Sequence, residues 1–207
     1  MKEAVIIGYS GHAYVVLDLL LANKYSIKGY CENRVIIENP YKLVYLGSEN
    51  NYEVYNSIKH VDIFIAIGDN AIRKSIIENL LEKGSHLPSL IHPSAIVSDT
   101  VTMQGANVVM PGVVINSCAR LGKGIICNSS SIIEHECQIG DYVHIAPGAV
   151  LTGNVSIGNN SFIGANAVIK PGIKISDNVI IGAGAVVTKN IDSGEIVAGN
   201  PANPINI

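Results

Sequence analysis

His135 stands between two carboxylates in the segment Ile133-Glu134-His135-Glu136-Cys137. An imidazole has an ordinary pKa of about 6.5, so at neutral pH it can take a proton from an amine or hydroxyl as that group attacks an acyl donor. A neighbouring carboxylate can orient the ring and stabilise its charged form. A histidine on a repeated surface can also be a plain surface residue, and the segment alone leaves both interpretations open.

A second candidate site is the turn Gly8-Tyr9-Ser10-Gly11-His12, between an apolar run and apolar residues at helical spacing. Free backbone N–H groups at the start of a helix favour phosphate binding. Glu32 follows Gly8 at about the distance where ribose contacts fall in dinucleotide folds. The turn lacks the full dinucleotide fingerprint, so nicotinamide is not expected. His12 either caps the helix or contacts a sugar phosphate, and both remain open.

The elements that position His135 come from a six-residue repeat. Every sixth residue from Ile91 to Val187 is apolar, and the residue four places later is mostly small or β-branched. Period six fits short parallel strands with a corner after each one, stacked into coils that share a core. Three hexapeptides per coil predict about five coils over 91–187. The apolar column is Ile91, Val97, Met103, Val109, Ile115, Leu121, Cys127, Ile133, Ile139, Ile145, Leu151, Ile157, Ile163, Ile169, Ile175, Ile181 and Val187.

The first part of the chain shows strand and helix patterns in alternation, which predict a small parallel sheet of the α/β class. We therefore expect two domains, an α/β Rossmann-like domain over 1–88 and a β-helix with a short tail over 89–207. The expected strands are Ala4–Ile7, Ile27–Tyr30 and Val61–Ile67, and the expected helices contain Val15–Leu20 and Ile72–Leu81. The tail at 197–202 is expected to form a loop that leaves the helix axis.

The composition limits which binding partners and which cellular compartment are expected. The net charge of −3 gives no reason to expect nucleic acid. No apolar run approaches the roughly 20 residues that span a bilayer, and the N-terminal segment is a poor signal peptide, so a cytoplasmic protein is expected. None of the four cysteines forms a Cys-x-x-Cys pair, and no metal-ligand spacing appears. Cys127 and Cys137 fall on core positions and are expected to be buried thiols.

Four segments together carry a resemblance to a known family: the Gly8–His12 turn, FIAIGDNAIRKSI at 64–76, LIHPSA at 90–95, and NSSSIIEHECQIGDYVHIAPGAVLTGNVSIG at 128–158. The chain resembles the hexapeptide-repeat sugar O-acyltransferases of the sialic acid O-acetyltransferase type over nearly its whole length. It is most similar to their bacterial branch that N-acetylates UDP-linked 4-amino sugars, as in the UDP-N-acetylbacillosamine pathway. The resemblance implies a left-handed β-helix, a homotrimer with active sites between subunits, and acetyl-CoA as co-substrate without a metal.

The resemblance also implies roles for matched residues. His135 is the general base and Glu136 its neighbour. Residues matching the nucleotide-sugar or acceptor site are Ser10, Gly11, His12, Glu32, Asn33, Gly68 and Asn128. Residues matching positions that face acetyl-CoA are His144, Gly153, Ala165 and Ala183, with Gly153 as a candidate for the oxyanion contact.

Two features qualify this assignment. Related enzymes often carry Asp-Asp where this chain has Glu32-Asn33, and the stretch from Arg34 to Lys59 is longer than in the bacillosamine enzyme. Both differences fall near the nucleotide, so the identities of the nucleobase and the sugar stay open. His144 also lies nine residues after His135, half of an 18-residue coil, so the two rings point to opposite sides of one chain. They can share a site only if His144 comes from a neighbouring subunit.

The sequence thus predicts an acetyl-CoA-dependent N-acetyltransferase acting on a nucleotide-linked 4-amino-4,6-dideoxy sugar, with UDP favoured. The first alternative is O-acetylation of sialic acid or another sugar hydroxyl on the same fold. A γ-carbonic-anhydrase-like enzyme would need three histidines around zinc, but the repeat offers only His92, His135 and His144, and the last two lie on opposed faces. A non-catalytic β-helix scaffold is the remaining alternative.

Overall fold

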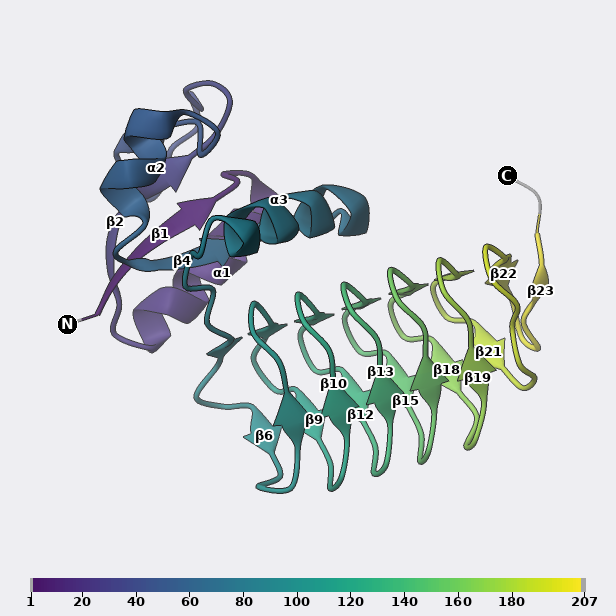
Figure 1. Ribbon diagram of the computed structural model, residues 1–207. Coiled ribbons are helices and arrows are strands. Elements are labelled where there is room, and N and C mark those ends of the chain that lie inside the picture. Colours follow the sequence, from purple (N-terminus) through teal and green to yellow (C-terminus); the bar gives the residue numbers. More distant parts are fainter. Residues whose placement is uncertain (1, 206–207) are drawn as a thin grey trace. The chain divides into compact units, whose positions relative to one another are not determined.

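The structure is a computed structural model that describes residues 2–205. The chain divides into two compact units, Met1–Leu90 and Ile91–Ile207 (Figure 1). None of the helices in 2–205 is long and apolar enough to cross a membrane.

The first unit is a four-stranded parallel sheet with strand order β3-β2-β1-β4. The expected strands and helices are present, but the fourth strand of the sheet is shorter than expected. The sequence did not predict β3 or α2, which lie in the long stretch after Asn33. The elements are β1 (Glu3–Ile7), α1 (Gly11–Ala22), β2 (Ser26–Cys31), β3 (Tyr45–Gly47), α2 (Tyr52–Ile58), β4 (Asp62–Ile65) and α3 (Asn70–Glu82).

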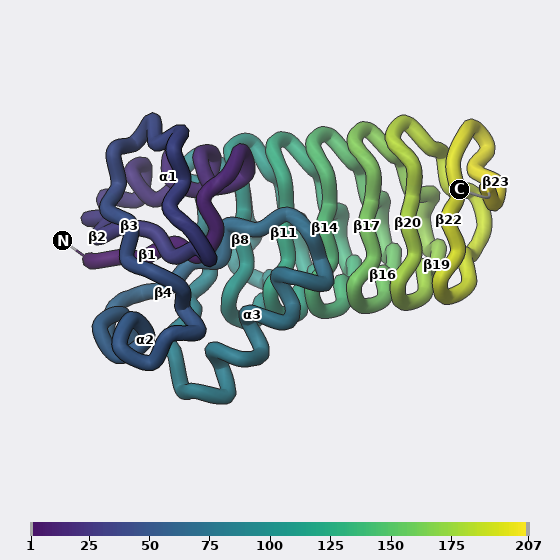
Figure 2. The backbone as a smooth tube through the Cα atoms, turned by 90° about the horizontal axis from the view of Figure 1, so that it is seen from above, coloured from purple at the N-terminus to yellow at the C-terminus, as the bar shows by residue number. Residues whose placement is uncertain are grey.

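The helices of this unit cover both faces of the sheet. α1 lies on one side, and α2 and α3 lie on the other (Figure 2). Right-handed crossovers require α1 and α2 to lie on opposite faces, because the chain moves outward from β1 to β3 and then returns past β1 to β4. The turns after all four strands therefore meet at one edge of the sheet, where ligands bind in open α/β sheets.

The second unit is a three-sided parallel β-helix in which the strands from β6 to β21 pair with strands 18 residues away. Ile126, for example, pairs with Val108 in the coil before it and with His144 in the coil after it. The apolar column predicted from the repeat is buried from Val109 onward, as the stacked coils require.

Its strands form three sheets. Sheet B contains β5 (Leu90–Ile91), β8 (Val108–Val109), β11 (Ile126–Cys127), β14 (His144–Ile145), β17 (Phe162–Ile163), β20 (Ile180–Ile181), β22 (Ile196–Ala198) and β23 (Asn203–Pro204). Sheet C contains β6 (Ile96–Val97), β9 (Val114–Ile115), β12 (Ile132–Ile133), β15 (Val150–Leu151), β18 (Val168–Ile169) and β21 (Val186–Val187). Sheet D contains β7 (Thr102–Met103), β10 (Arg120–Leu121), β13 (Gln138–Ile139), β16 (Ser156–Ile157) and β19 (Lys174–Ile175).

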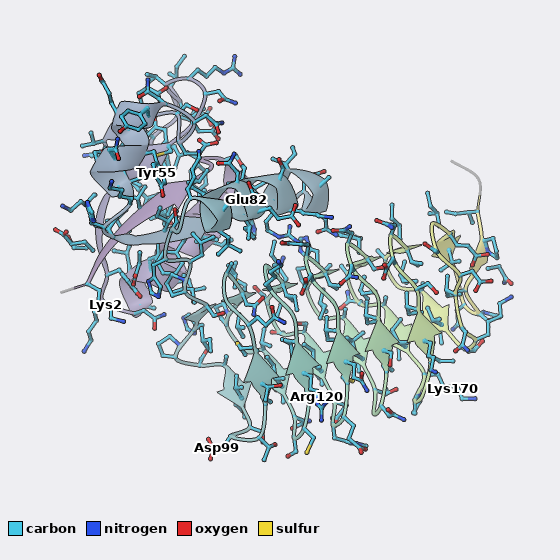
Figure 3. The ribbon with its side chains drawn as sticks, in the orientation of Figure 1. Lys2, Tyr55, Glu82, Asp99, Arg120 and Lys170 are labelled. Carbon is cyan, nitrogen blue, oxygen red and sulfur yellow. The ribbon has the colours of Figure 1, made fainter. Side chains whose placement is uncertain are left out.

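We name each corner by the sheets that it joins. In four successive coils the C–D corner holds one residue in the left-handed backbone region, namely Cys118, Glu136, Asn154 and Gly172. Backbone bonds join successive corners: Glu136 N donates to Ser117 O at 3.0 Å and Asn154 N to His135 O at 2.8 Å. The side chains of Asp99, Arg120 and Lys170 point outward from the β-helix (Figure 3).

The tail differs from expectation. Val197, the first residue of the expected loop, is fully buried in β22, which pairs with β20 and extends sheet B. The chain turns after β22 through a cis bond between Asn200 and Pro201, and β23 pairs antiparallel with β22. The expectation of a loop over 197–202 was therefore wrong at its start, because Val197 supplies the next apolar residue of the core.

Candidate active site

His135 lies at the C–D corner two residues after the end of β12, and its side chain is 59% exposed. Its Nδ1 lies 3.2 Å from Oε2 of Glu136, and its backbone N donates to Oε2 of Glu134 at 3.3 Å. A carboxylate only accepts, so Nδ1 carries the proton in this contact and Nε2 is the basic nitrogen. The corner thus presents an oriented imidazole that can accept a proton at Nε2.

Gly153 occupies the same corner one coil further on. A Cβ placed there would lie 2.6 Å from both Nε2 and Cε1 of His135. Its backbone N–H finds no acceptor within residues 2–205. The absence of a side chain therefore lets the histidine ring lie close to this segment, with an N–H donor nearby.

Glu136 holds an unfavourable backbone conformation at this corner. Its φ is 63°, whereas the equivalent residues of the next two coils are Asn154 and Gly172, which adopt left-handed φ values more easily. Such a conformation costs a residue of this type about 1 kcal/mol. This unfavourable conformation occurs at the corner where the Glu136 carboxylate contacts the His135 ring.

Other matched residues gather at the B–C corner. Asn128 follows β11, and its Nδ2 lies 3.3 Å from Nε2 of His144 on β14. The His144 ring packs edge-on against Phe162, with centroids 5.1 Å apart. Ala165 and Ala183 occupy this corner in two successive coils, and Gly184 N donates to Ala165 O at 2.8 Å.

The matched residues of the β-helix therefore form two sets on different corners of one chain. His135, Glu136 and Gly153 share the C–D corner, whereas Asn128 lies beside His144 near the B–C corner. The C–D corner faces sheet B across the coil, so His144 and His135 lie on opposite sides of it. Asn128, matched to the acceptor site, is not beside His135 within one chain.

The turn after β1 has the geometry of an anion site. Gly8 has a φ of 92°, and a Cβ there would lie 2.7 Å from Cγ1 of Ile67, so only glycine fits. Ser10 is the N-cap of α1, and its side chain makes no capping bond. A Cβ on Gly11 would meet nothing within 4 Å, which leaves space over the helix N-terminus.

This turn borders a cavity of about 300 Å³ at the carboxyl edge of the sheet. Glu32 is fixed there, since its Oε1 accepts from Tyr9 N at 3.0 Å and its Oε2 from Asn33 N at 3.3 Å. Of the predicted nucleotide-site residues, Ser10, Glu32 and Asn33 line the cavity. Its remaining lining residues are Ile7, Gly8, Cys31, Glu49, Ile67, Ile72 and Ile76.

Gly11, His12 and Gly68 do not line the cavity. His12 lies inside the first turn of α1, where Ser10 is the cap, so His12 does not cap the helix. Burial, with a smaller contribution from the Arg73 guanidinium, lowers the pKa of His12 to about 4, which keeps the ring neutral at pH 7. Arg73 donates to the carbonyl of Gly68 at 2.9 Å and thereby shapes the turn after β4.

Sequence reasoning missed Glu49, Cys31 and Arg73. Glu49 follows β3, a three-residue strand with no readable alternation, so no pattern placed it at the sheet edge. Cys31 could have been inferred, because it ends β2 immediately before Glu32. Burial raises the pKa of the Cys31 thiol to about 12, helped by the charges of Glu49 and Glu32, so the thiol stays protonated.

Within residues 2–205 no three His, Cys, Asp or Glu side chains gather in a way that could hold a metal ion. All four cysteines are free thiols, and Cys127 and Cys137 are buried, as their core positions predicted.

Each of the two units matches a known protein family. The family model of the PglD N-terminal domain matches residues 3–80, and that of the hexapeptide repeat of succinyl-transferase matches residues 154–189. The acetyltransferase domain of PglB from Neisseria gonorrhoeae FA1090, solved in complex with acetyl coenzyme A, is 36% identical, covers 99% of both chains and superposes with a TM-score of 0.92.

Two curated relatives are also similar. GDP-perosamine N-acetyltransferase from Escherichia coli O157:H7 is 34% identical over 67% of this chain and 56% of its own length. UDP-N-acetylbacillosamine N-acetyltransferase from Bacillus subtilis (strain 168) is 33% identical over 53% of this chain and 52% of its own. The chain thus matches only about half the length of these two relatives.

The β-helix with its histidine-bearing corner defines the class, a hexapeptide-repeat protein of the acyltransferase type. Since the N-terminal unit is of the PglD kind and a relative matches end to end, the chain belongs to the family of hexapeptide-repeat sugar acyltransferases with a PglD-type N-terminal domain. The predicted resemblance is confirmed, as is the fold class of a Rossmann-like parallel sheet followed by a left-handed parallel β-helix.

Proposed function

We propose that the protein transfers the acetyl group of acetyl-CoA to the amino group of a nucleotide-linked sugar. The observation that carries the proposal is the His135 ring, held at Nδ1 by Glu136 with its Nε2 beside Gly153. Two relatives are named N-acetyltransferases of nucleotide-linked sugars, and a third is solved with acetyl coenzyme A. From the resemblance, the finer expectation is a UDP-linked 4-amino-4,6-dideoxy sugar used in glycan or glycoprotein biosynthesis.

In this proposal His135 is the general base. Its Nε2 takes a proton from the amine as the nitrogen attacks the thioester carbonyl, the C–S bond breaks, and the proton passes to the departing thiolate. Glu136 keeps the proton on Nδ1 and stabilises the imidazolium. The N–H of Gly153 supplies a donor for the developing oxyanion. The thioester is already activated, so the transfer is direct and uses neither a metal nor a covalent enzyme intermediate.

We further propose a homotrimer with shared active sites, and the outer face of sheet C supports it. That face presents one β-branched apolar residue per coil, and the first of them, Ile96, is 67% exposed. Three copies that bury this stripe about a common axis place the C–D corner of one subunit beside the B–C corner of the next. His135 of one chain and the Asn128–His144 pair of another would then share a cleft. The stripe is Ile96, Val114, Ile132, Val150, Val168 and Val186.

The two units have separate roles in this account. Residues 1–88 bind the nucleotide sugar, with the diphosphate at the Gly8–Gly11 turn and the ribose near Glu32. Residues 89–207 bind acetyl-CoA and carry the base. The cytoplasmic location belongs to the same proposal, since four free thiols suit a reducing compartment.

The test is acetyl-CoA turnover, measured as thiol release, with UDP-, GDP- and dTDP-linked 4-amino sugars and with free sialic acid. We expect turnover with a nucleotide sugar, lost by about 100-fold or more in His135→Ala and kept in the control His92→Ala. Turnover only with sialic acid would move the assignment to O-acetylation. No turnover with any acceptor would contradict the proposed function.

A further inference from the structure

The nucleotide cavity contains two carboxylates, although its proposed ligand is an anion. Glu32 follows β2 and Glu49 follows β3, while the Gly8 turn follows β1. The sheet order β3-β2-β1-β4 therefore sets the anion-binding turn, then Glu32, then Glu49 along one edge.

Glu49 is held inside this edge. The residue is only 8% exposed, and Oε1 accepts from Nδ2 of its neighbour Asn50 at 3.1 Å. Ile76 of α3 lines the cavity with it, and both also border the smaller adjoining cavity. Burying a carboxylate is costly unless it receives hydrogen bonds, so a ligand placed here should bring donors.

The parts of a nucleotide then fall in order along the edge. Phosphate oxygens are repelled by both carboxylates and belong at the Gly8–Ser10 turn. Ribose hydroxyls can donate to Glu32, in the position that acidic residues take in dinucleotide folds. The nucleobase then lies furthest from the phosphates, beside Glu49.

A carboxylate discriminates strongly among nucleobases. Guanine offers two adjacent donors, N1–H and the N2 amino group, which match the two oxygens of one carboxylate. Uracil and thymine offer one N3–H between two carbonyls, so the second carboxylate oxygen faces an acceptor. Adenine and cytosine pair their amino group with an adjacent ring-nitrogen acceptor.

We propose that Glu49 reads the nucleobase and selects guanine, so that the acceptor is a GDP-linked amino sugar. This inference rests on the proposed function and replaces the UDP preference expected from the resemblance. Glu49 is a specificity-determining residue, remote from the acetyl transfer itself.

The test compares binding of GDP, IDP and UDP by titration calorimetry in the native protein, Glu49→Gln and the control Glu53→Gln. IDP lacks only the N2 amino group, so it loses one bond to a charged acceptor. We expect GDP to bind native protein about tenfold or more tighter than IDP or UDP. In Glu49→Gln the amide can still meet N1–H and O6, so the GDP-to-IDP ratio should fall to near one, whereas Glu53→Gln should keep the native ratio.

UDP binding as tight as GDP, or a GDP-to-IDP ratio that Glu49→Gln leaves unchanged, would overturn the assignment of guanine to Glu49. Thiol release separates this failure from failure of the proposed function. Faster turnover of a UDP-linked than of a GDP-linked 4-amino sugar refutes the base assignment alone, whereas turnover of neither refutes both.

Discussion

The β-helix and the N-terminal unit present their candidate sites in different ways. In the β-helix each corner has copies in neighbouring coils, so Glu136 can be compared directly with Cys118, Asn154 and Gly172. Cys118 and Glu136 both hold the left-handed conformation without being Asn or Gly, and of these two Glu136 places a carboxylate against a histidine ring. The N-terminal unit has no internal copy, and its cavity is defined by strand order and turn geometry alone. A repeat thus supplies its own control positions.

Gly153→Ala should have the largest effect on activity. The added Cβ would lie 2.6 Å from the His135 ring, which must swing away from its place beside the Gly153 N–H. Displacement of a catalytic group by about 1 Å can lower turnover about 100-fold. Thiol release and unfolding temperature measure the two consequences separately.

The background His135→Ala provides the control for this substitution. Without the ring, Gly153→Ala should cause no further loss of turnover. A further loss of similar size in that background would mean that alanine acts through something other than the ring.

The neutral His12 should make stability depend on pH. Its pKa is about 4 in the folded chain and about 6.5 when unfolded, so between these values the unfolded chain binds more protons. Stability due to this group is therefore complete above pH 6.5 and is lost as pH falls toward 4. We expect a loss of about 2 kcal/mol between pH 6.5 and 5 that is absent in His12→Gln. Urea unfolding at both pH values measures this loss of stability, with His92→Gln as the control. If His12→Gln lost as much stability as the native protein over the same pH range, the assignment to His12 would be contradicted.

Gly11→Ala tests the anion site at the start of α1. The new Cβ meets no protein atom within 4 Å, and alanine favours a helix over glycine. Stability should therefore hold or rise, while nucleotide binding weakens about tenfold because the methyl group occupies the space proposed for phosphate. Titration calorimetry with GDP and UDP measures the nucleotide affinity. Unchanged affinity for both nucleotides would contradict phosphate binding at this turn.

Glu136→Asn should have the smallest energetic effect and the clearest internal control. Asparagine adopts left-handed φ values more readily, so the substitution should stabilise the β-helix by about 1 kcal/mol. Turnover should fall, because the His135 ring loses its carboxylate. Cys118→Asn relieves the same backbone conformation one coil earlier and should stabilise the chain while turnover stays native. If both variants lower turnover equally, Glu136 has no special role.

Sequence reasoning was most successful where structure repeats. The six-residue column placed Val109 through Val187 in the core, because a stacked coil buries the same position each time. The positions of Gly8 and Glu32 at strand ends were also predicted, since both follow strands with clear apolar runs, and both residues line the cavity. Glu49 was not found, because β3 is three residues long and is held mainly by its pairing with β2. Gly153 and His135 lie in adjacent coils, and the sequence does not show that the His135 ring leaves no room for a side chain at position 153.

In the proposed trimer, His135 and His144 act in one site built by two subunits. The most direct measurement mixes two variants, His135→Ala and His144→Ala, each carrying a different tag, and purifies trimers that contain both. We expect each variant alone to turn over acetyl-CoA poorly and mixed trimers to recover turnover, because each mixed trimer contains a cleft with both native histidines. Mixed trimers no more active than either parent would contradict the shared site.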